Sequence, residues 1–314
     1  MLWVHRSGMD MGRGLLVHDW IYSFHMPLFF MIAGYSHGMK DRFSSGHNYL
    51  YYFTKFLLDL YIPCLIFSLM YWSLNYFVFA SSGNNPSNFK LASLNDLYRL
   101  PFFGFNQYWF LCTLFLIKIT HTALEYLFHE HKILNSAFWL LLFVSGQFIH
   151  IPGFFAQLFS GFYFHIGYIM RTREGFERSK ILYALILICA GILCYVIPFM
   201  NDSFNFFTRT GAALGMSLGL FTLFYSLKIN NSFLVLCGVN CMVIYCLHNY
   251  VTSIFRFIYK FSGLSSLNAP VLMFLLCFVL AVLIPLLVVK IYKRVKFLRW
   301  IEYIFYPGEL FYKK

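Results

Sequence analysis

Long stretches without charged residues dominate the pattern of polar and apolar positions in this chain. About 20 apolar residues suffice for an α-helix to cross the hydrocarbon core of a bilayer. The runs free of Asp, Glu, Lys and Arg that approach or exceed this length are residues 20–39, 60–89, 100–117, 133–170, 181–201, 210–227, 229–255 and 261–289. Each run predicts membrane-spanning helix, because backbone polar groups in lipid must be paired within their own element.

One of these runs is too long for a single crossing, and the chain starts with an apolar stretch that is too short. Residues 133–170 contain Pro152 and Gly153 near their middle, where these residue types favour a turn, so we expect two spans there. Met1–Val4 is apolar and is followed by His5 and Arg6, which predicts the end of a helix that begins before Met1. The expected fold is all-α. It is a polytopic transmembrane bundle forming a single domain over residues 1–314, with nine full spans plus a truncated N-terminal helix.

Basic residues divide unequally between the alternate loops of this arrangement. Cytoplasmic loops of membrane proteins are enriched in Lys and Arg. With the C-terminus in the cytoplasm, 17 of the 24 basic residues fall on the cytoplasmic side. Both ends of the ten-helix architecture are therefore predicted to be cytoplasmic, and the longest polar loop, Ser81 to Leu100, is predicted to lie on the outer side.

Composition supports a membrane protein and argues against other classes. The chain is 60% hydrophobic and 11% charged, whereas a soluble domain carries about 25% charged residues. The formal net charge is +12. Its basic residues lie in the predicted loops, so charge-directed topology explains them better than nucleic-acid binding does. All eight cysteines lie in apolar runs without a CxxC motif, so we interpret them as packing residues.

Two histidines are candidates for chemistry, because ionisable groups at membrane depth are costly and mark functional sites. His25 is predicted to open its helix at the outer end, with Pro27 in the first turn. His5 lies at the outer end of the preceding helical stub, so we expect both rings at a similar depth. A lone histidine is explained equally well by a structural hydrogen bond between helices, whereas a pair from adjacent helices favours a polar site.

Further polar side chains are expected in two later spans. Trp109 and Thr113 are four residues apart and share a helical face, although Trp109 also fits an aromatic belt at the membrane interface. Cys241, Tyr245 and His248 share a face of another helix, and His248 is expected toward its outer half. A third histidine at a similar depth strengthens the prediction of a polar cavity.

Two other patterns receive a structural interpretation. Gly211, Gly215 and Gly219 recur every four residues, which is typical of close helix packing, and we assign them no chemistry. The histidines and glutamates between residues 121 and 131 are predicted to lie in a short cytoplasmic loop at irregular spacing. We therefore do not expect a metal site among them.

Four segments, taken in order, resemble those of the acyltransferase 3 family, in particular its branch of fucose 4-O-acetylase-like membrane acetyltransferases. Phe24–Tyr35 is similar to the branch's His-Met-Pro-Leu-Phe-Phe segment and its small-residue-Gly ending. Tyr108–Phe115 resembles a Trp-Phe-Leu-x-x-Leu-Phe stretch, and Phe162–Arg171 resembles a Phe-x-x-Gly-Tyr helix. Gly238–His248 is similar to a Gly-x-Asn-Ser-x-x-Ile-Tyr-x-x-His stretch, with Cys241 in place of the serine.

The resemblance implies an O-acyltransferase of the bacterial cytoplasmic membrane. It would move an acyl group, usually acetyl from acetyl-CoA, to a sugar hydroxyl of a surface or exported polysaccharide or its lipid-linked precursor. His5 would be the general base and His25 would orient or assist it. The residues expected to line the cavity and stabilise the intermediate are Trp109, Asn240, Tyr245 and His248. Those expected to bind the phosphates of the acyl donor are Lys40, Arg42, Lys55, Arg171 and Arg173. No bound cofactor or metal is expected.

Departures from the family pattern leave a second function open. The family's first helix carries a basic residue well before its histidine, and this sequence has none at that distance before His5. Asp59 stands shortly before Ile62-Pro63, where an arginine is expected. Both departures favour a transporter or flippase for a glycan or lipid-linked sugar, which would use the same cavity without acyl chemistry. A structural scaffold for a polysaccharide synthase is a third possibility.

Overall fold

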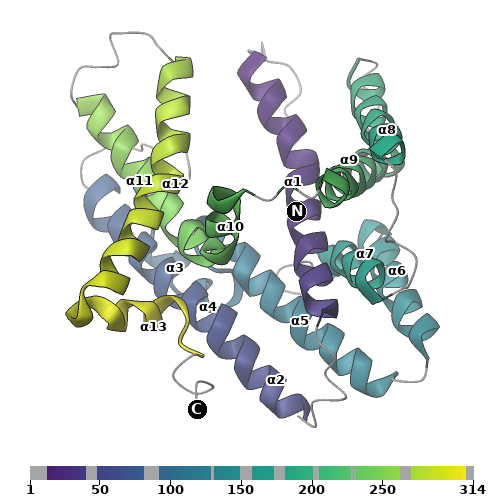
Figure 1. The fold of residues 1–314 in the computed structure, drawn as a ribbon, viewed down its shortest axis with the longest axis horizontal. Helices are drawn as coiled ribbons and strands as arrows, with labels where there is room; N and C mark the ends of the chain where they lie inside the picture. Colours follow the sequence, from purple (N-terminus) through teal and green to yellow (C-terminus); the bar gives the residue numbers. More distant parts are fainter. Residues whose placement is uncertain are drawn as a thin grey trace. The chain divides into compact units, whose positions relative to one another are not determined.

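The computed structural model describes residues 13–39, 48–80, 92–128, 131–148, 158–172, 181–200, 205–227, 229, 231–261 and 270–308. Every regular element in these ranges is helical, as the all-α prediction expected (Figure 1). The long helices are α1 (Arg13–Gly38), α3 (Ile62–Leu74), α5 (Trp109–Leu127), α6 (Lys132–Phe148), α7 (Gly161–Thr172), α8 (Ile181–Met200), α9 (Phe206–Leu227), α11 (Cys241–Phe261) and α12 (Pro270–Arg294). The short ones are α2 (Tyr49–Phe56), α4 (Leu100–Phe103), α10 (Ser232–Val239) and α13 (Glu302–Phe305).

Several of these helices are long and apolar enough to cross a membrane. Among the described residues, six segments meet that requirement: Tyr49–Phe77, Asn106–Leu127, Ile181–Pro198, Phe206–Leu227, Cys241–Tyr259 and Leu275–Arg294. Large apolar side chains of α8, such as Leu182 and Ile186, are exposed in the isolated chain, which suits a surface that contacts lipid. The chain is an integral membrane protein. The count of nine spans stays a prediction, and the predicted stub at Met1–Val4 lies outside the described residues.

The chain forms two compact units, each assembled from segments that are distant in sequence. Unit 1 comprises Met1–Tyr49 and Leu116–Ile229, and unit 2 comprises Leu50–Phe115 and Asn230–Lys314. In unit 1, α1 packs against α7 and α9, α8 packs against α9, and α6 packs against α7. In unit 2, α11 packs against α12 and α10, and α3 contacts α4 and α13. Each unit therefore has its own set of polar contacts.

Two glycines set how closely α1 approaches α7. A Cβ atom at Gly34 would lie 1.8 Å from the carbonyl oxygen of Phe164, and one at Gly167 would lie 1.9 Å from that of Met31. Both clashes are with backbone, which cannot turn aside as a side chain can. The glycines thus permit backbone contact between the two helices, as small residues do in membrane interfaces. This contact brings His37, near the end of α1, beside Phe164 of α7, with 5.1 Å between ring centroids.

The glycine stripe of α9 has the packing role that its spacing predicted. A Cβ atom at Gly215 would lie 2.8 Å from the Cα atom of Gly191 in α8. At Gly211 it would lie 3.0 Å from the Cys194 sulfur, and at Gly219 it would lie 2.6 Å from the Ile188 side chain. The prediction for Gly211, Gly215 and Gly219 is confirmed, and the whole stripe faces α8.

Some predicted helix boundaries are wrong, and the errors have one physical reason. The segment predicted to begin at residue 60 is helical from Tyr49, with Lys55 and Asp59 inside it. α5 likewise continues to Leu127, beyond Lys118. Runs without charge mark only the part of a helix that must be apolar. The backbone hydrogen bonds continue past it, because charged side chains are tolerated near helix ends.

Breaks inside two predicted spans were also missed. In the run 100–117, Gly104 and Asn106 have positive φ angles of 63° and 57°, which Gly adopts freely and Asn tolerates. Gly104 ends α4, and Asn106 begins η4 (Asn106–Tyr108), which leads into α5. In the run 229–255, Asn240 ends α10 with non-helical backbone angles before α11 begins at Cys241. Both breaks place polar residues of the candidate site at helix ends.

Candidate functional site

His25 lies within α1 rather than at its start. α1 begins at Arg13, so Pro27 lies inside the helix and not in its first turn, which corrects the prediction for both residues. The ring nitrogen Nδ1 of His25 is 3.0 Å from the Ile21 carbonyl oxygen. An Nδ1–H that donates to this oxygen places the basic lone pair of a neutral ring on Nε2. The partner predicted for this ring, His5, lies outside the described residues.

A hydroxyl from another helix fixes α1 close to Pro27. Ser217 of α9 donates its hydroxyl hydrogen to the Phe24 carbonyl oxygen at 3.0 Å. Proline disturbs the helical hydrogen bonds of the preceding turn, and serine side chains commonly compensate such disturbance in membrane helices. This bond therefore holds the turn that carries His25 in place within unit 1.

In unit 2, a polar network joins α11 to Gln107 of η4, the short helix before α5. The Tyr245 hydroxyl donates to the Gln107 carbonyl oxygen, and the Asn249 amide donates to the Gln107 side-chain oxygen. His248 lies one helical turn from Tyr245, and its Nδ1 is 2.7 Å from the Tyr245 carbonyl oxygen. This geometry again places the basic lone pair on Nε2. The rings of Tyr245 and His248 lie 5.8 Å apart between centroids, and Gln107 and Asn249 extend the network.

The sequence prediction missed Gln107 because it treated residues 100–117 as one uninterrupted helix. The break at Gly104 and Asn106 frees the carbonyl of Gln107 to accept from α11. Its only sequence signal is an amide side chain in an apolar run. Trp109, the next candidate, is half-buried and begins α5, where its carbonyl accepts from Thr113 at 2.9 Å.

Asn240 belongs to a different part of unit 2, a groove between α10 and α12. Its amide donates to the Leu236 carbonyl oxygen at 2.8 Å, and the side chain lines a groove of about 680 Å³. Apolar residues of both helices form most of the walls. The basic residues that also line it, all near the C-terminal end of α12, are Lys290, Lys293 and Arg294. The groove combines an apolar wall with positive charge.

The residues predicted to bind the acyl donor are only partly described. Lys40, Arg42 and Arg173 lie outside the described residues. Lys55 is on α2 in unit 2, whereas Arg171 is on α7 in unit 1. The Arg171 guanidinium contacts Tyr35, with Nη1 3.4 Å from the hydroxyl and the charge centre 5.6 Å from the ring centroid.

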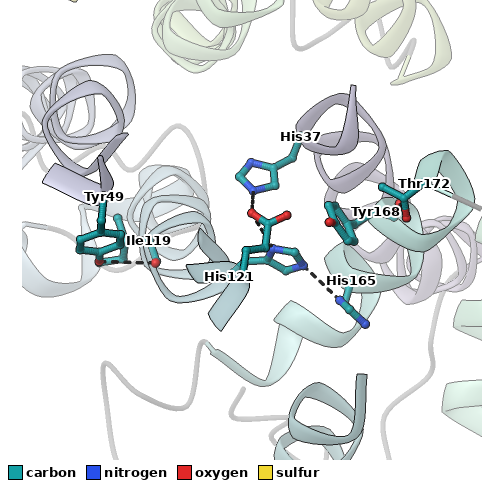
Figure 2. A network of polar contacts seen from close by, with 8 residues as sticks. His37, Tyr49, Ile119, His121, His165, Tyr168 and Thr172 are labelled. Atoms are coloured by element: carbon teal, nitrogen blue, oxygen red, sulfur yellow. Dashed lines mark hydrogen bonds and ion pairs between the residues drawn. The ribbon is translucent and has the colours of Figure 1, made fainter. Parts of the chain in front are cut away.

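A buried group of histidines and one glutamate was not predicted (Figure 2). His121 and Glu125 lie on the last turns of α5, which corrects their predicted place in a loop. His37 of α1 and His165 of α7 approach them within unit 1. His37 Nε2 is 3.6 Å and His121 Nδ1 is 3.7 Å from Glu125 Oε2. The spacing of four residues between His121 and Glu125 was the available signal, because it places them on one helical face.

The second nitrogen of His121 continues the group into α7 and α6. His121 Nε2 is 3.1 Å from His165 Nδ1, and His165 Nε2 is 3.0 Å from the Ser136 hydroxyl oxygen. Trp139 stacks beside the His121 ring at 5.9 Å between centroids, and Tyr168 meets it edge-on at 4.5 Å. The rings are therefore fixed in orientation, and the group can relay protons or hold a cation.

Comparison with known proteins identifies the family. The family model of an acyltransferase domain, acyltransferase 3, matches residues 6–290, and the chain belongs to this family. No curated protein and no solved structure matches the chain significantly. The predicted family is confirmed, and the chain is a membrane acyltransferase by family.

Proposed function

We propose that this membrane acyltransferase transfers an acyl group from an acyl-CoA to a sugar hydroxyl. The main candidate for the donor is acetyl-CoA. The acceptor would be a surface or exported polysaccharide, or its lipid-linked precursor, at a bacterial inner membrane. The family match over residues 6–290 is the observation that carries this proposal. The described histidines support it, because His25 and His248 each place Nδ1 against a backbone carbonyl. That arrangement leaves Nε2 as the proton acceptor that acyl transfer to a hydroxyl needs.

In the proposed reaction, a neutral histidine takes the proton of the sugar hydroxyl as its oxygen attacks the thioester carbonyl. The tetrahedral intermediate then collapses with cleavage of the carbon–sulfur bond. The departing CoA sulfur recovers the proton from the histidinium, so the enzyme returns to its starting state. We assign the base to His5 and the supporting role to His25, as the family resemblance implies.

We retain Trp109 and Asn240 as proposed donors to the oxyanion of the intermediate. Asn240 has a second amide N–H besides the one it donates to Leu236, and the Trp109 indole is a donor with no acceptor role. The Tyr245 hydroxyl already donates to Gln107. We therefore assign Tyr245 and His248 to holding the cavity wall rather than to contacting the oxyanion.

The acyl donor's phosphates need cations. We retain Lys40, Arg42, Lys55, Arg171 and Arg173 as proposed contacts. We add the groove between α10 and α12, because its apolar wall and its basic residues suit an anionic amphiphile such as acyl-CoA.

The test uses the full-length protein, purified in detergent and incubated with labelled acetyl-CoA and a glycan acceptor. Replacing His5 or His25 by Ala should reduce transfer about 100-fold or more, as expected for loss of a general base or its support. His131→Ala is the matched control, because His131 is exposed on the connection after α5. Unaltered turnover in both variants would overturn the assignment. A glycan phenotype in cells without any transfer of acetyl would instead favour the transporter.

A further inference from the structure

Three atoms of the types that bind metals converge inside unit 1. They are Nε2 of His37, Nδ1 of His121 and a carboxylate oxygen of Glu125, and all lie within 4.8 Å of one another. The three residues are 3%, 0% and 7% exposed. Two chain segments far apart in sequence supply them, and the glycine contact between α1 and α7 fixes the end of α1 that carries His37. Ligand-type atoms rarely gather in an apolar interior unless something compensates their desolvation.

The separations between these atoms are too long for direct hydrogen bonds. An N–H···O hydrogen bond spans about 2.7–3.2 Å between heavy atoms, whereas the two nitrogens stand 3.6 and 3.7 Å from Glu125 Oε2. Within the described part of the chain, His121 Nδ1 makes no hydrogen bond. Two ligands of one tetrahedral zinc ion, bound at about 2.0–2.1 Å, lie about 3.3 Å apart. For the two nitrogen–oxygen pairs, a shared ion therefore requires only a few tenths of an ångström of contraction. The two nitrogens, which lie within 4.8 Å of each other, would move closer by up to about 1.5 Å.

The opposite side of the His121 ring has the support that metal-binding histidines usually have. Its Nε2 contacts His165, which in turn contacts Ser136. A histidine ligand normally uses its second nitrogen in such a bond, which fixes the tautomer and the ring orientation. With the proton on Nε2, the lone pair of Nδ1 points toward the carboxylate. Two electron-rich atoms facing each other in a buried space repel unless a proton or a metal cation lies between them.

We propose that His37, His121 and Glu125 bind a divalent transition-metal ion, Zn²⁺ by preference, that joins α1 to α5 within unit 1. Two imidazole nitrogens and one carboxylate suit zinc, whereas Mg²⁺ and Ca²⁺ select oxygen ligands. The competing explanation is a hydrogen-bonded histidine–carboxylate group without metal. The site is independent of the acyl-transfer proposal, so each can fail without the other.

Metal content is the first test. The full-length protein is purified in detergent, stripped with a chelator, incubated with ZnCl₂ alone and separated from free ion by gel filtration. We expect about one zinc per chain, and near-background zinc in His37→Ala, His121→Ala and Glu125→Gln. Glu125→Gln is the sharpest variant, because it keeps the size and hydrogen-bonding capacity of the side chain and removes its charge. His131→Ala is the matched control and should bind zinc as the wild type does.

Two further measurements separate a metal site from a misfolded variant or a relay. Zinc should raise the thermal midpoint of the stripped wild type and leave that of monodisperse Glu125→Gln unchanged. His165→Ala should still bind one zinc but about 10–100-fold more weakly, because it removes the support of a ligand and not the ligand. If the folded wild type bound no stoichiometric zinc and its thermal midpoint did not respond to zinc, the group would be a hydrogen-bonded relay. Equal zinc in wild type and Glu125→Gln would show adventitious binding, and either result would overturn the proposal.

Discussion

Individual hydrogen bonds hold the polar residues of unit 2 in place. Gln107 accepts from Tyr245 through its backbone and from Asn249 through its side chain. The two bonds have different consequences for mutation. Removing the Tyr245 hydroxyl still leaves the Gln107 carbonyl the Trp109 backbone N–H as a donor, whereas shortening Gln107 leaves the Asn249 amide without this acceptor.

We expect Gln107→Ala to lower the free energy of unfolding more than Tyr245→Phe does. An unpaired polar group in a partly buried place costs about 1–3 kcal/mol, and loss of one ordinary hydrogen bond costs about 1 kcal/mol. Thermal unfolding of the two purified variants in the same detergent measures the difference. Equal midpoints for Gln107→Ala and wild type would show that this network does not stabilise unit 2.

At the scale of single residues, only part of the candidate site could be predicted from the sequence. The functional candidates Tyr245 and His248 could be predicted from their spacing, because i, i+3 and i+4 positions share a face of any helix. The group of His37, His121 and Glu125 could not. His37 and His121 are more than 80 positions apart in the sequence, and they approach each other where both contact α7, through Phe164 and His165. Spacing within one helix carries no information about such an approach.

At the scale of elements, backbone contact between helices positions the buried histidines. Gly34 and Gly167 each face a carbonyl of the opposite helix at a distance that admits no Cβ atom. The sequence revealed the repeated glycines of α9 because they recur at period four. The contact of α1 with α7 uses Gly34 and Gly38 of α1 and Gly167 of α7. One pair of glycines four residues apart is a weaker signal than the three that recur in α9.

Substitution of Gly34 by Leu should therefore separate α1 from α7. Overpacking of a close contact costs about 1–3 kcal/mol or more, and here the obstacle is backbone. We expect a lower thermal midpoint and, under the metal proposal, loss of the zinc response. Gly238→Ala is the matched control, since nothing lies within 4 Å of a Cβ atom there and Ala favours a helix by up to about 1 kcal/mol. A Gly34→Leu protein as stable as Gly238→Ala would contradict the packing argument.

The basic end of α12 offers a second element-scale prediction, which rests on the proposed function. Replacing Lys290, Lys293 and Arg294 together by Gln should raise KM for acetyl-CoA about tenfold and leave kcat close to the wild-type value. These residues would supply binding that is equal in the ground and transition states. Steady-state kinetics at varied donor concentration provide the measurement. An unchanged KM accompanied by altered dependence on anionic lipid would instead assign the groove to a lipid headgroup.

At the scale of the whole molecule, the membrane class follows from composition, because a chain with 11% charged residues cannot cover itself with polar surface. The span boundaries do not follow in the same way. Lys55 and Asp59 lie inside a continuous helical segment, and Asn240 interrupts a run that composition alone treats as one helix. Hydropathy indicates whether lipid or water surrounds a segment. The ends of a helix depend instead on the local backbone conformation at single residues.

The orientation of the helices in the membrane decides which helix ends can meet a cytoplasmic acyl donor. The excess of basic residues predicts that the C-terminus is cytoplasmic and that the loop between Ser81 and Leu100 is external. A reporter that is active only in the cytoplasm should therefore function when fused after Lys314 and fail when inserted near Asn84. A reporter active only outside should show the reverse pattern. With this topology, Lys290, Lys293 and Arg294 would lie on the side where acyl-CoA is available. The opposite pattern would remove the groove from the donor's compartment and with it the proposed role of α12.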